Sequence, residues 1–191
     1  NDPKNISKNV KFLDESDAVI FLLDTFSIPY IHDKLNIKGE IELKYDVILN
    51  NIIDHFKNGD KKKKEAHFGK PMAFAFSKID AILDHSEDLA ETAIPGMTLD
   101  QNSPFLDGGG VRMDDIDAVS DGLRAALNSW YEDGFVNNAE NNYKNLKYFG
   151  FSALGKDPGN DNHIEGIKPY RVLDPLIWIL DQFKYPLLKQ K

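Results

Sequence analysis

Three short apolar runs alternate with longer amphipathic segments along the chain. The clearest run is 72–76, five apolar residues in a row between a Gly-Lys-Pro turn and the polar residues Ser77 and Lys78. An unbroken run of this length is typical of a strand that is buried on both faces of a parallel sheet. Residues 18–23 and 147–151 have the same character, so we expect three parallel strands that are neighbours in chain order.

Helical periodicity marks the longer segments. Apolar residues recur on one helical face from about 42 to 57 and again from Asp114 to about 133. A shorter stripe of the same kind occupies 5–13. Apolar residues also alternate within 41–47, which leaves a strand open as the alternative for that part of the chain.

The closing element and the connections are predicted from local signals. Asp174 as an N-cap, with a proline directly after it, indicates a closing helix over 175–184. Residues 25–39 are predicted as a long connection and the asparagine-rich 137–145 as a loop. The basic run 61–64 is predicted as a solvated loop in preference to a phosphate or lipid patch, because acidic residues flank it.

The spacing of these elements sets the architecture. More than sixty residues separate the second and third strands, far more than a simple connection needs, which indicates an insertion at about 84–145. At 191 residues and 41% hydrophobic content, the chain can bury one good core. We therefore predict a single α/β domain over 1–191, a three-layer sandwich with a mainly parallel sheet.

Composition narrows the classes of function. The formal net charge of -8 argues against a nucleic-acid partner, which needs clustered Lys and Arg. The chain has no cysteine, and none of its apolar runs approaches the roughly 20 residues of a membrane span, so we expect a cytoplasmic protein without a membrane partner. The five histidines lack the spacing of metal ligands, and no metal site is predicted.

Polar residues follow two of the predicted strands directly. In open α/β sheets, ligands bind at the carboxyl ends of the strands, and neighbouring strands are only about 5 Å apart. We therefore expect the loops after the second and third strands to lie within one ligand's width of each other. The candidate site residues in these loops are Ser77, Lys78, Asp80, Ser152, Ala153 and Leu154. Asp24 ends the first strand and could touch the same site, although a turn residue is the favoured interpretation.

Both loops resemble motifs of one family. Ser77-Lys78-Ile79-Asp80 resembles the [Asn/Thr]-Lys-x-Asp base motif of P-loop GTPases, and Ser152-Ala153-Leu154 resembles their second base loop, Ser-Ala-Lys. The resemblance implies that Asp80 accepts hydrogen bonds from guanine N1 and N2, that Lys78 lies along the base plane, and that the Ala153 N–H donates to O6. Ser77 replaces the usual Asn, and Leu154 replaces the usual Lys. The second loop and the closing helix look most like the bacterial double-GTPase group.

Two other segments nearly spell family motifs. Residues 150–157 almost match the phosphate-loop signature GxxxxGK[ST], but Asp157 replaces the hydroxyl that binds Mg²⁺, and a Pro-Gly-Asn loop follows where a helix is needed. Residues 107–110 match Asp-x-x-Gly but lie inside the insertion, where a glycine turn is expected. Neither segment is predicted to bind phosphate.

The resemblance covers roughly 5–80 and 146–185, the second half of the family fold. Hydrolysis in this family depends on a phosphate loop, a switch threonine and Asp-x-x-Gly around Mg²⁺, and these would all precede residue 1. We therefore expect the guanine-binding half of a GTPase-like protein, with no catalytic residue of its own. GTP or GDP binding should be weak or absent in this chain, and Mg²⁺ binding and hydrolysis would need an upstream half. The alternative is a non-catalytic α/β protein–protein interaction module that uses the 84–145 insertion as its partner surface.

Overall fold

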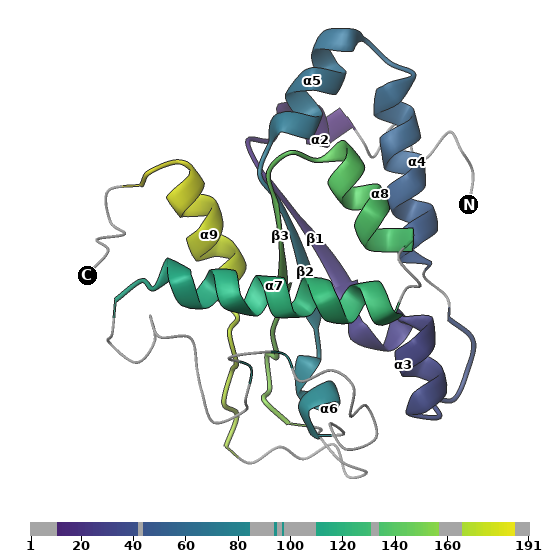
Figure 1. Ribbon diagram of the computed structural model, residues 1–191, viewed down its shortest axis with the longest axis vertical. Coiled ribbons are helices and arrows are strands. Elements are labelled where there is room, and N and C mark those ends of the chain that lie inside the picture. Colours follow the sequence, from purple (N-terminus) through teal and green to yellow (C-terminus); the bar gives the residue numbers. More distant parts are fainter. Residues whose placement is uncertain are drawn as a thin grey trace.

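The computed structural model of this chain describes residues 11–41, 44–84, 94, 97, 110–130, 134–156 and 166–185. Within these ranges a parallel sheet runs in the order β1-β2-β3, formed by β1 (Val19–Asp24), β2 (Met72–Ser77) and β3 (Leu146–Gly150) (Figure 1). The register between β1 and β2 is unbroken, from Val19 opposite Met72 to Asp24 opposite Ser77. The predicted strands, their parallel direction and their order are confirmed, and each boundary moves by at most one residue.

The central strand β2 is buried because its side chains enter two apolar cores. Phe74 and Phe76 pack into the larger core, while Ala73 and Ala75 pack into the smaller core on the other face. All of these side chains are buried, which explains the unbroken apolar run. The small alanines let a helix approach the sheet closely on their side.

Helices lie before, between and after the strands, as in other α/β folds. The helical elements among the described residues are α2 (Lys11–Glu15), η1 (Thr25–Ser27), α3 (Pro29–Lys34), α4 (Tyr45–Lys57), α5 (Lys61–Gly69), α6 (Ile79–Asp84), α7 (Met113–Trp130), α8 (Gly134–Asn142) and α9 (Asp174–Gln182). In Figure 1 the amino ends of the strands lie toward α5 and the carboxyl end of β2 lies toward α6.

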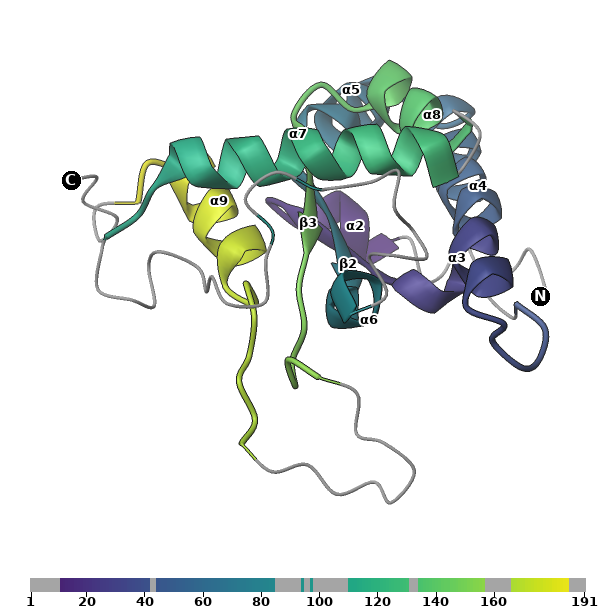
Figure 2. The ribbon, with the colours of Figure 1, turned by 60° about the horizontal axis from the view of Figure 1, so that its bottom comes forward.

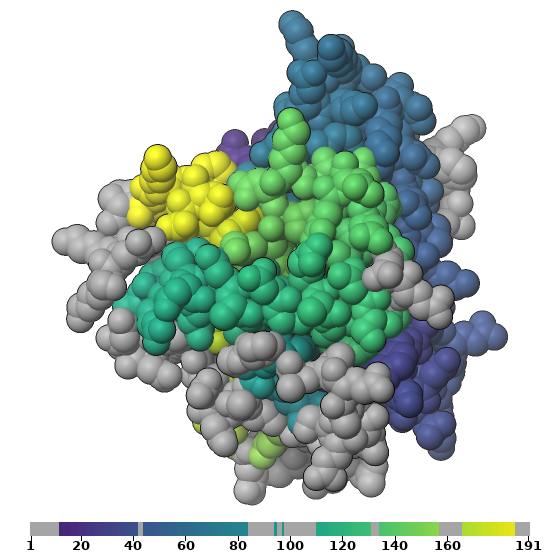
Figure 3. Space-filling view, viewed as in Figure 1, coloured from purple at the N-terminus to yellow at the C-terminus, as the bar shows by residue number. Residues whose placement is uncertain are grey.

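Helices pack against both faces of the sheet. On the alanine face, Trp178 of α9 lies 5.7 Å from Phe149 of β3 between ring centres. On the phenylalanine face, Phe135 of α8 lies 5.3 Å from Phe74, beside buried side chains of α4 and α7. α7 runs across the sheet from α9 toward α3 (Figure 2), and its side chains close over the strands together with those of α8 (Figure 3). The fold is thus α/β, with a small open parallel sheet and helices.

The two long amphipathic helices are confirmed with shifted starts. α4 begins at Tyr45, so the alternative of a strand over 41–47 is wrong. α7 covers most of the predicted 114–133 stripe. Asp114 lies inside the first turn of α7 instead of preceding it, and its carboxylate pairs with Arg112 at 2.8 Å.

The closing helix is also confirmed, but Asp174 is wrong as its N-cap. Asp174 is the first helical residue, and Leu173 occupies the cap. The Asp174 carboxylate instead pairs with Arg171, 2.6 Å from Nε to Oδ2. Of the predicted 5–13 stripe, only the part in α2 lies within the described residues.

Two segments that were predicted as connections are partly helical. In 25–39, Pro29 occupies the first turn of α3, so the proline starts a helix instead of interrupting one. The lysine run 61–64 is the beginning of α5, so the loop prediction is wrong there. Asp60 caps this helix by accepting the Lys62 N–H at 2.7 Å.

The asparagine-rich segment 137–145 is largely helical as well, because most of it lies in α8. Phe135, Val136 and Ala139 of α8 are buried. This apolar stripe into the core outweighs the low helix propensity of asparagine. The described part of the 84–145 insertion therefore belongs to the core of the domain.

The two near-motifs fall partly outside the described residues, which do not include 107–109 or 157. Among the residues that the structure describes, no helix combines the length and the apolar character needed to cross a membrane.

Candidate functional site

A cavity of about 480 Å³, here called the carboxyl-edge cavity, opens where β2 and β3 end. Its volume falls in the range of small-ligand sites, about 300 to 1,000 Å³. It is lined by Phe26, Ser77, Lys78, Asp80, Ala81, Phe151, Ser152, Ala153, Leu154 and Lys156. All the predicted site residues are among these, so the expectation that the two loops meet at this edge is confirmed. Their role in binding a base stays a prediction.

Hydrogen bonds between the strand ends bring the two loops together. The Ile79 N–H donates to the Phe151 carbonyl at 3.2 Å, and the Phe151 N–H donates to the Phe76 carbonyl at 2.9 Å. Gly150 completes the junction, because a Cβ at that position would overlap the Met97 side chain and lie 2.9 Å from Ile79 Cγ1. The sheet therefore fixes the loops relative to each other.

Asp80 supplies the most unusual polar group of the cavity. It lies in the first turn of α6, and only 6% of it is exposed. Its Oδ1 accepts no hydrogen bond from any described residue. A buried carboxylate oxygen without a donor is costly, and native proteins leave few of them. Because this oxygen is shielded from solvent, the N–H groups of a ligand would reach it only after the Asp80 side chain turns toward the cavity, where one carboxylate accepts two such donors side by side.

Lys78 is held in place by contacts from the end of β1. Its backbone is left-handed, with a φ of 58°, a conformation that costs energy in any residue except glycine. Its ammonium pairs with Asp24 Oδ2 at 2.7 Å and lies 4.9 Å from the centre of the Phe26 ring. Asp24 Oδ1 also accepts the Phe26 N–H at 3.1 Å. Asp24 therefore does more than end a strand, because it positions Lys78 beside the cavity.

Ser77 joins the ends of β1 and β2. Its hydroxyl donates to the Leu23 carbonyl at 3.1 Å, and its carbonyl accepts a hydrogen bond from the Thr25 hydroxyl. Since the Ser77 hydroxyl is used within the sheet, this residue contributes to the cavity wall chiefly as scaffold.

The second loop is held by the side chain and backbone of Ser152. Its hydroxyl oxygen accepts the N–H groups of Leu154 at 3.3 Å and Gly155 at 2.7 Å. Its backbone forms an antiparallel bridge with Tyr170, with bonds of 2.9 and 2.7 Å. Gly155 has a φ of 76°, and a Cβ there would overlap a neighbouring carbonyl, so the turn requires glycine. Ala153 is left exposed at the cavity.

A buried charge cluster supports this loop from behind. Arg171 is 1% exposed and lies 2.7 Å from Asp115 Oδ2 on α7 and 2.6 Å from Asp174 Oδ2 on α9. Burial alone would lower the pKa of Arg171, but the two carboxylates raise it overall. Burial raises the pKa of the adjacent Tyr170 to about 12. The cluster ties the bridge behind the second loop to two helices.

Some lining residues were missed from the sequence. Phe26 lies in η1, inside a segment that was predicted as a connection, and an aspartate at the end of the neighbouring strand was the only hint of it. Lys156 belongs to the near phosphate-loop match and is placed in the cavity wall by the turn at Gly155. Within the described ranges, no group of His, Asp or Glu side chains is arranged to hold a metal ion.

A larger cavity of about 550 Å³ lies between α3, α4 and α7 and contains none of the predicted site residues. The charged residues in its wall, Asp33, Lys44 and Asp46, are all exposed. The Tyr45 hydroxyl in its wall already accepts the Asp24 N–H at 2.9 Å. Because no buried charge lines this space, the carboxyl-edge cavity is the better candidate site.

Comparison with protein-family models, with curated proteins and with solved structures found no match for this chain. The assignment of the site therefore depends on its geometry and chemistry.

Proposed function

We propose that this chain binds a guanine base in the carboxyl-edge cavity and is the base-recognition half of a GTPase-like protein. The observation that carries this proposal is the buried Asp80 carboxylate, whose Oδ1 has no donor among the described residues and which shares the cavity with the Ala153 backbone. The resemblance of both loops to the base loops of P-loop GTPases supports the same conclusion.

Guanine suits the groups of this cavity chemically. Its N1–H and N2–H donors lie side by side and match one carboxylate, whereas adenine lacks this donor pair. Guanine O6 is an acceptor for the Ala153 N–H. The Lys78 stem and the Phe26 ring, whose centre lies 4.9 Å from the Lys78 ammonium, offer apolar surface to a planar base.

We expect weak binding and no hydrolysis by this chain alone. A hydrogen bond to a charged group contributes about 1.5 to 3 kcal/mol. Association costs at least about 4 kcal/mol, so binding of GTP or GDP should be about millimolar or weaker. Hydrolysis depends on groups that position the phosphates around Mg²⁺, and we assign no such group to the carboxyl-edge cavity.

The test is a titration of the ¹⁵N-labelled chain with guanosine, inosine and adenosine, followed by amide chemical shifts. Guanosine at about 5 mM should shift the amides of Ala153, Leu154 and the residues around Asp80. Inosine, which lacks the N2 amine, should bind more weakly, and adenosine should leave these amides unchanged. Equal responses to guanosine and adenosine would contradict the proposal.

The alternative function is a non-catalytic α/β module for protein–protein interaction. It predicts a folded chain that shows no response to guanosine. α7 and α8, within the 84–145 insertion, bury their apolar faces in the core. A partner of this insertion would therefore contact the polar faces of these helices.

A further inference from the structure

The wall of the carboxyl-edge cavity contains several polar side chains, and most of them are used within the fold. The Ser77 hydroxyl donates to a carbonyl of the neighbouring strand at 3.1 Å. The Lys78 ammonium pairs with Asp24 Oδ2 at 2.7 Å. Ser152 is 2% exposed, and its hydroxyl oxygen accepts two N–H groups of the second loop. These three groups therefore stabilise the two loops, and a ligand would have to compete with the fold for them.

Lys156 differs from these residues because its ammonium is unpaired. Lys156 lines the same cavity, and its side chain is exposed. No hydrogen bond or ion pair joins its ammonium to any other residue that the structure describes. An ammonium carries three donors and no acceptor. Among the described side chains of the cavity wall, Lys156 therefore offers the donor that remains available to a ligand.

The second loop fixes the backbone of Lys156 relative to that of Ala153. The Lys168 N–H donates to the Leu154 carbonyl at 3.1 Å. Gly155 has a φ of 76°, which places the next residue on the far side of a tight turn. Ala153 and Lys156 are therefore held on one turn, and both contribute to the same wall of the cavity.

Guanine has two neighbouring acceptors, and the contacts proposed above use only one of them. With N1–H and N2–H directed to Asp80, O6 faces the Ala153 N–H, and N7 follows O6 on the side away from N1. The second loop is therefore next to both acceptors. A lysine ammonium is a common partner of the O6 and N7 atoms of guanine. Adenine has an amine in the place of O6, and this donor would oppose the ammonium.

We propose that Lys156 is a specificity-determining residue of the carboxyl-edge cavity and donates to the O6 and N7 edge of guanine. This inference rests on the proposed guanine binding and adds a contact on the edge of the base that Asp80 does not reach. The base then lies between a carboxylate that accepts from its donor edge and an ammonium that donates to its acceptor edge. Adenine satisfies neither group.

The test compares guanosine with 7-deazaguanosine, which has a C–H group in place of N7, in amide-shift titrations of the ¹⁵N-labelled chain. The wild type should bind guanosine about two- to fivefold more tightly than 7-deazaguanosine, as expected for an exposed charged contact. Lys156→Met should weaken guanosine binding by at least this factor and should remove the difference between the two nucleosides. Lys156→Arg retains donors for both acceptors and should keep the preference for guanosine.

The charge-matched control is Lys144→Met, because Lys144 is exposed and lies before the amino end of β3, opposite the cavity. It should leave both affinities unchanged. Equal affinities of the wild type for the two nucleosides would overturn the inference while leaving guanine binding intact. A preference for guanosine that persists in Lys156→Met, or that Lys144→Met removes equally, would overturn it as well. A wild-type chain that responds to neither nucleoside would contradict the proposed function, and this inference with it.

Discussion

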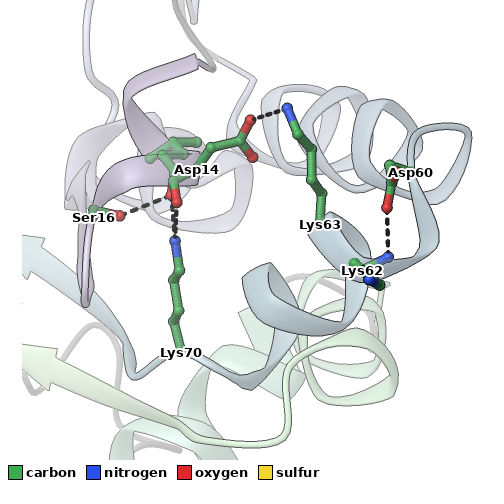
Figure 4. A network of polar contacts seen from close by, with 7 residues as sticks. Asp14, Ser16, Asp60, Lys62, Lys63 and Lys70 are labelled. Carbon is green, nitrogen blue, oxygen red and sulfur yellow. Dashed lines mark hydrogen bonds and ion pairs between the residues drawn. The ribbon is translucent and has the colours of Figure 1, made fainter.

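The two ends of the sheet differ in how their polar groups are paired, although one buried atom near the amino end, His67 Nδ1, also has no hydrogen-bond partner among the described residues. At the amino end, a network around α2 pairs the groups that lie next to the strands (Figure 4). Lys70 Nζ donates to the carbonyls of Leu13 and Asp14 at 2.6 and 2.9 Å. The Ser16 hydroxyl donates to the Leu13 carbonyl at 2.9 Å, and Lys63 pairs with the Asp14 carboxylate at 3.1 Å. These bonds satisfy the carbonyls that a helix end leaves open.

At the carboxyl end, one carboxylate oxygen is buried without a partner and one residue has a strained backbone, although the other polar groups described there are paired. Asp80 Oδ1 has no donor among the described residues, and Lys78 holds a left-handed backbone. Strain and unsatisfied groups persist only where the surrounding structure enforces them, and they concentrate at functional sites. This difference agrees with the proposal that the carboxyl end, and not the amino end, is the site of ligand binding.

The largest loss of stability is expected at the charge cluster behind the second loop, which should stabilise the fold as the amino-end network does. Arg171→Met leaves the Asp115 and Asp174 carboxylates without their cation in a buried site. Breaking a buried ion pair by removing one partner costs about 3 to 5 kcal/mol. Urea unfolding should show this loss, and a loss below about 1 kcal/mol would show that the cluster is not a structural support.

A pH effect of similar size is expected from His67, which is 1% exposed and near the amino end of the sheet. Burial, with a smaller contribution from Lys70, lowers its pKa from 6.5 to about 4. The unfolded chain then binds more protons than the folded chain between these values. His67 therefore contributes fully to stability above about pH 6.5, and this contribution of about 3 kcal/mol is lost as the pH falls to 4.

Unfolding measured from pH 7.5 to 4.5 checks this expectation. His67→Phe should be less pH-dependent than the wild type over this range, even if it is less stable overall, because it removes the bond between His67 Nε2 and the Tyr143 hydroxyl. The same pH dependence in both proteins would show that other groups cause it.

A smaller effect is expected from Lys70, whose ammonium donates to two carbonyls at the end of α2. Lys70→Met should destabilise the fold by about 1 to 2 kcal/mol, because those carbonyls lose a charged donor. The matched control is Lys61→Met on α5, where the exposed pair with Glu65 should contribute less than about 0.5 kcal/mol. Equal losses of stability in the two variants would show that Lys70 contributes no more to the fold than an exposed ion pair does.

The smallest effect on stability is expected at Asp80, despite its burial. Asp80→Ala removes a buried carboxyl group whose Oδ1 lacks a donor among the described residues, so the free energy of unfolding should stay the same or rise by up to about 1 kcal/mol. A clear loss of stability, of the size expected for Lys70→Met, would mean that Asp80 is a structural residue. The comparison between the two ends would then fail.

The apolar pattern identified the sheet from the sequence but did not identify the short helices α5 and α8. The run 72–76 is buried on both faces, and this leaves a local signal in the sequence. α5 and α8 were missed because lysines and asparagines dominate them. The Asp60 cap of α5 and the buried apolar stripe of α8 stabilise these helices only when the core of the fold is present. Asp174 was also wrongly predicted as the N-cap of α9, because its carboxylate pairs with Arg171 instead.

The part of the site that depends only on which strands are neighbours was predictable from the sequence. The loops with Asp80 and Ala153 follow neighbouring strands, so their meeting followed from strand order alone. Phe26 reaches the cavity in a short helix that Asp24 caps locally, a signal that was not used in the sequence analysis. Lys156 reaches it through a turn at Gly155 that packs against the Lys168 carbonyl, and no local pattern in the sequence carries that information.

The most direct test of guanine recognition is an exchange of base preference by Asp80→Asn. A side-chain amide at this position still accepts the guanine N1–H but opposes the N2 amine with its own donor. Xanthosine carries a carbonyl oxygen in place of that amine and should therefore become the better ligand. In amide-shift titrations, the wild type should respond to guanosine and not to xanthosine, and Asp80→Asn should respond to xanthosine and not to guanosine. If Asp80→Asn remains folded and keeps the wild-type response to guanosine, Asp80 does not read the base, and the central claim is contradicted.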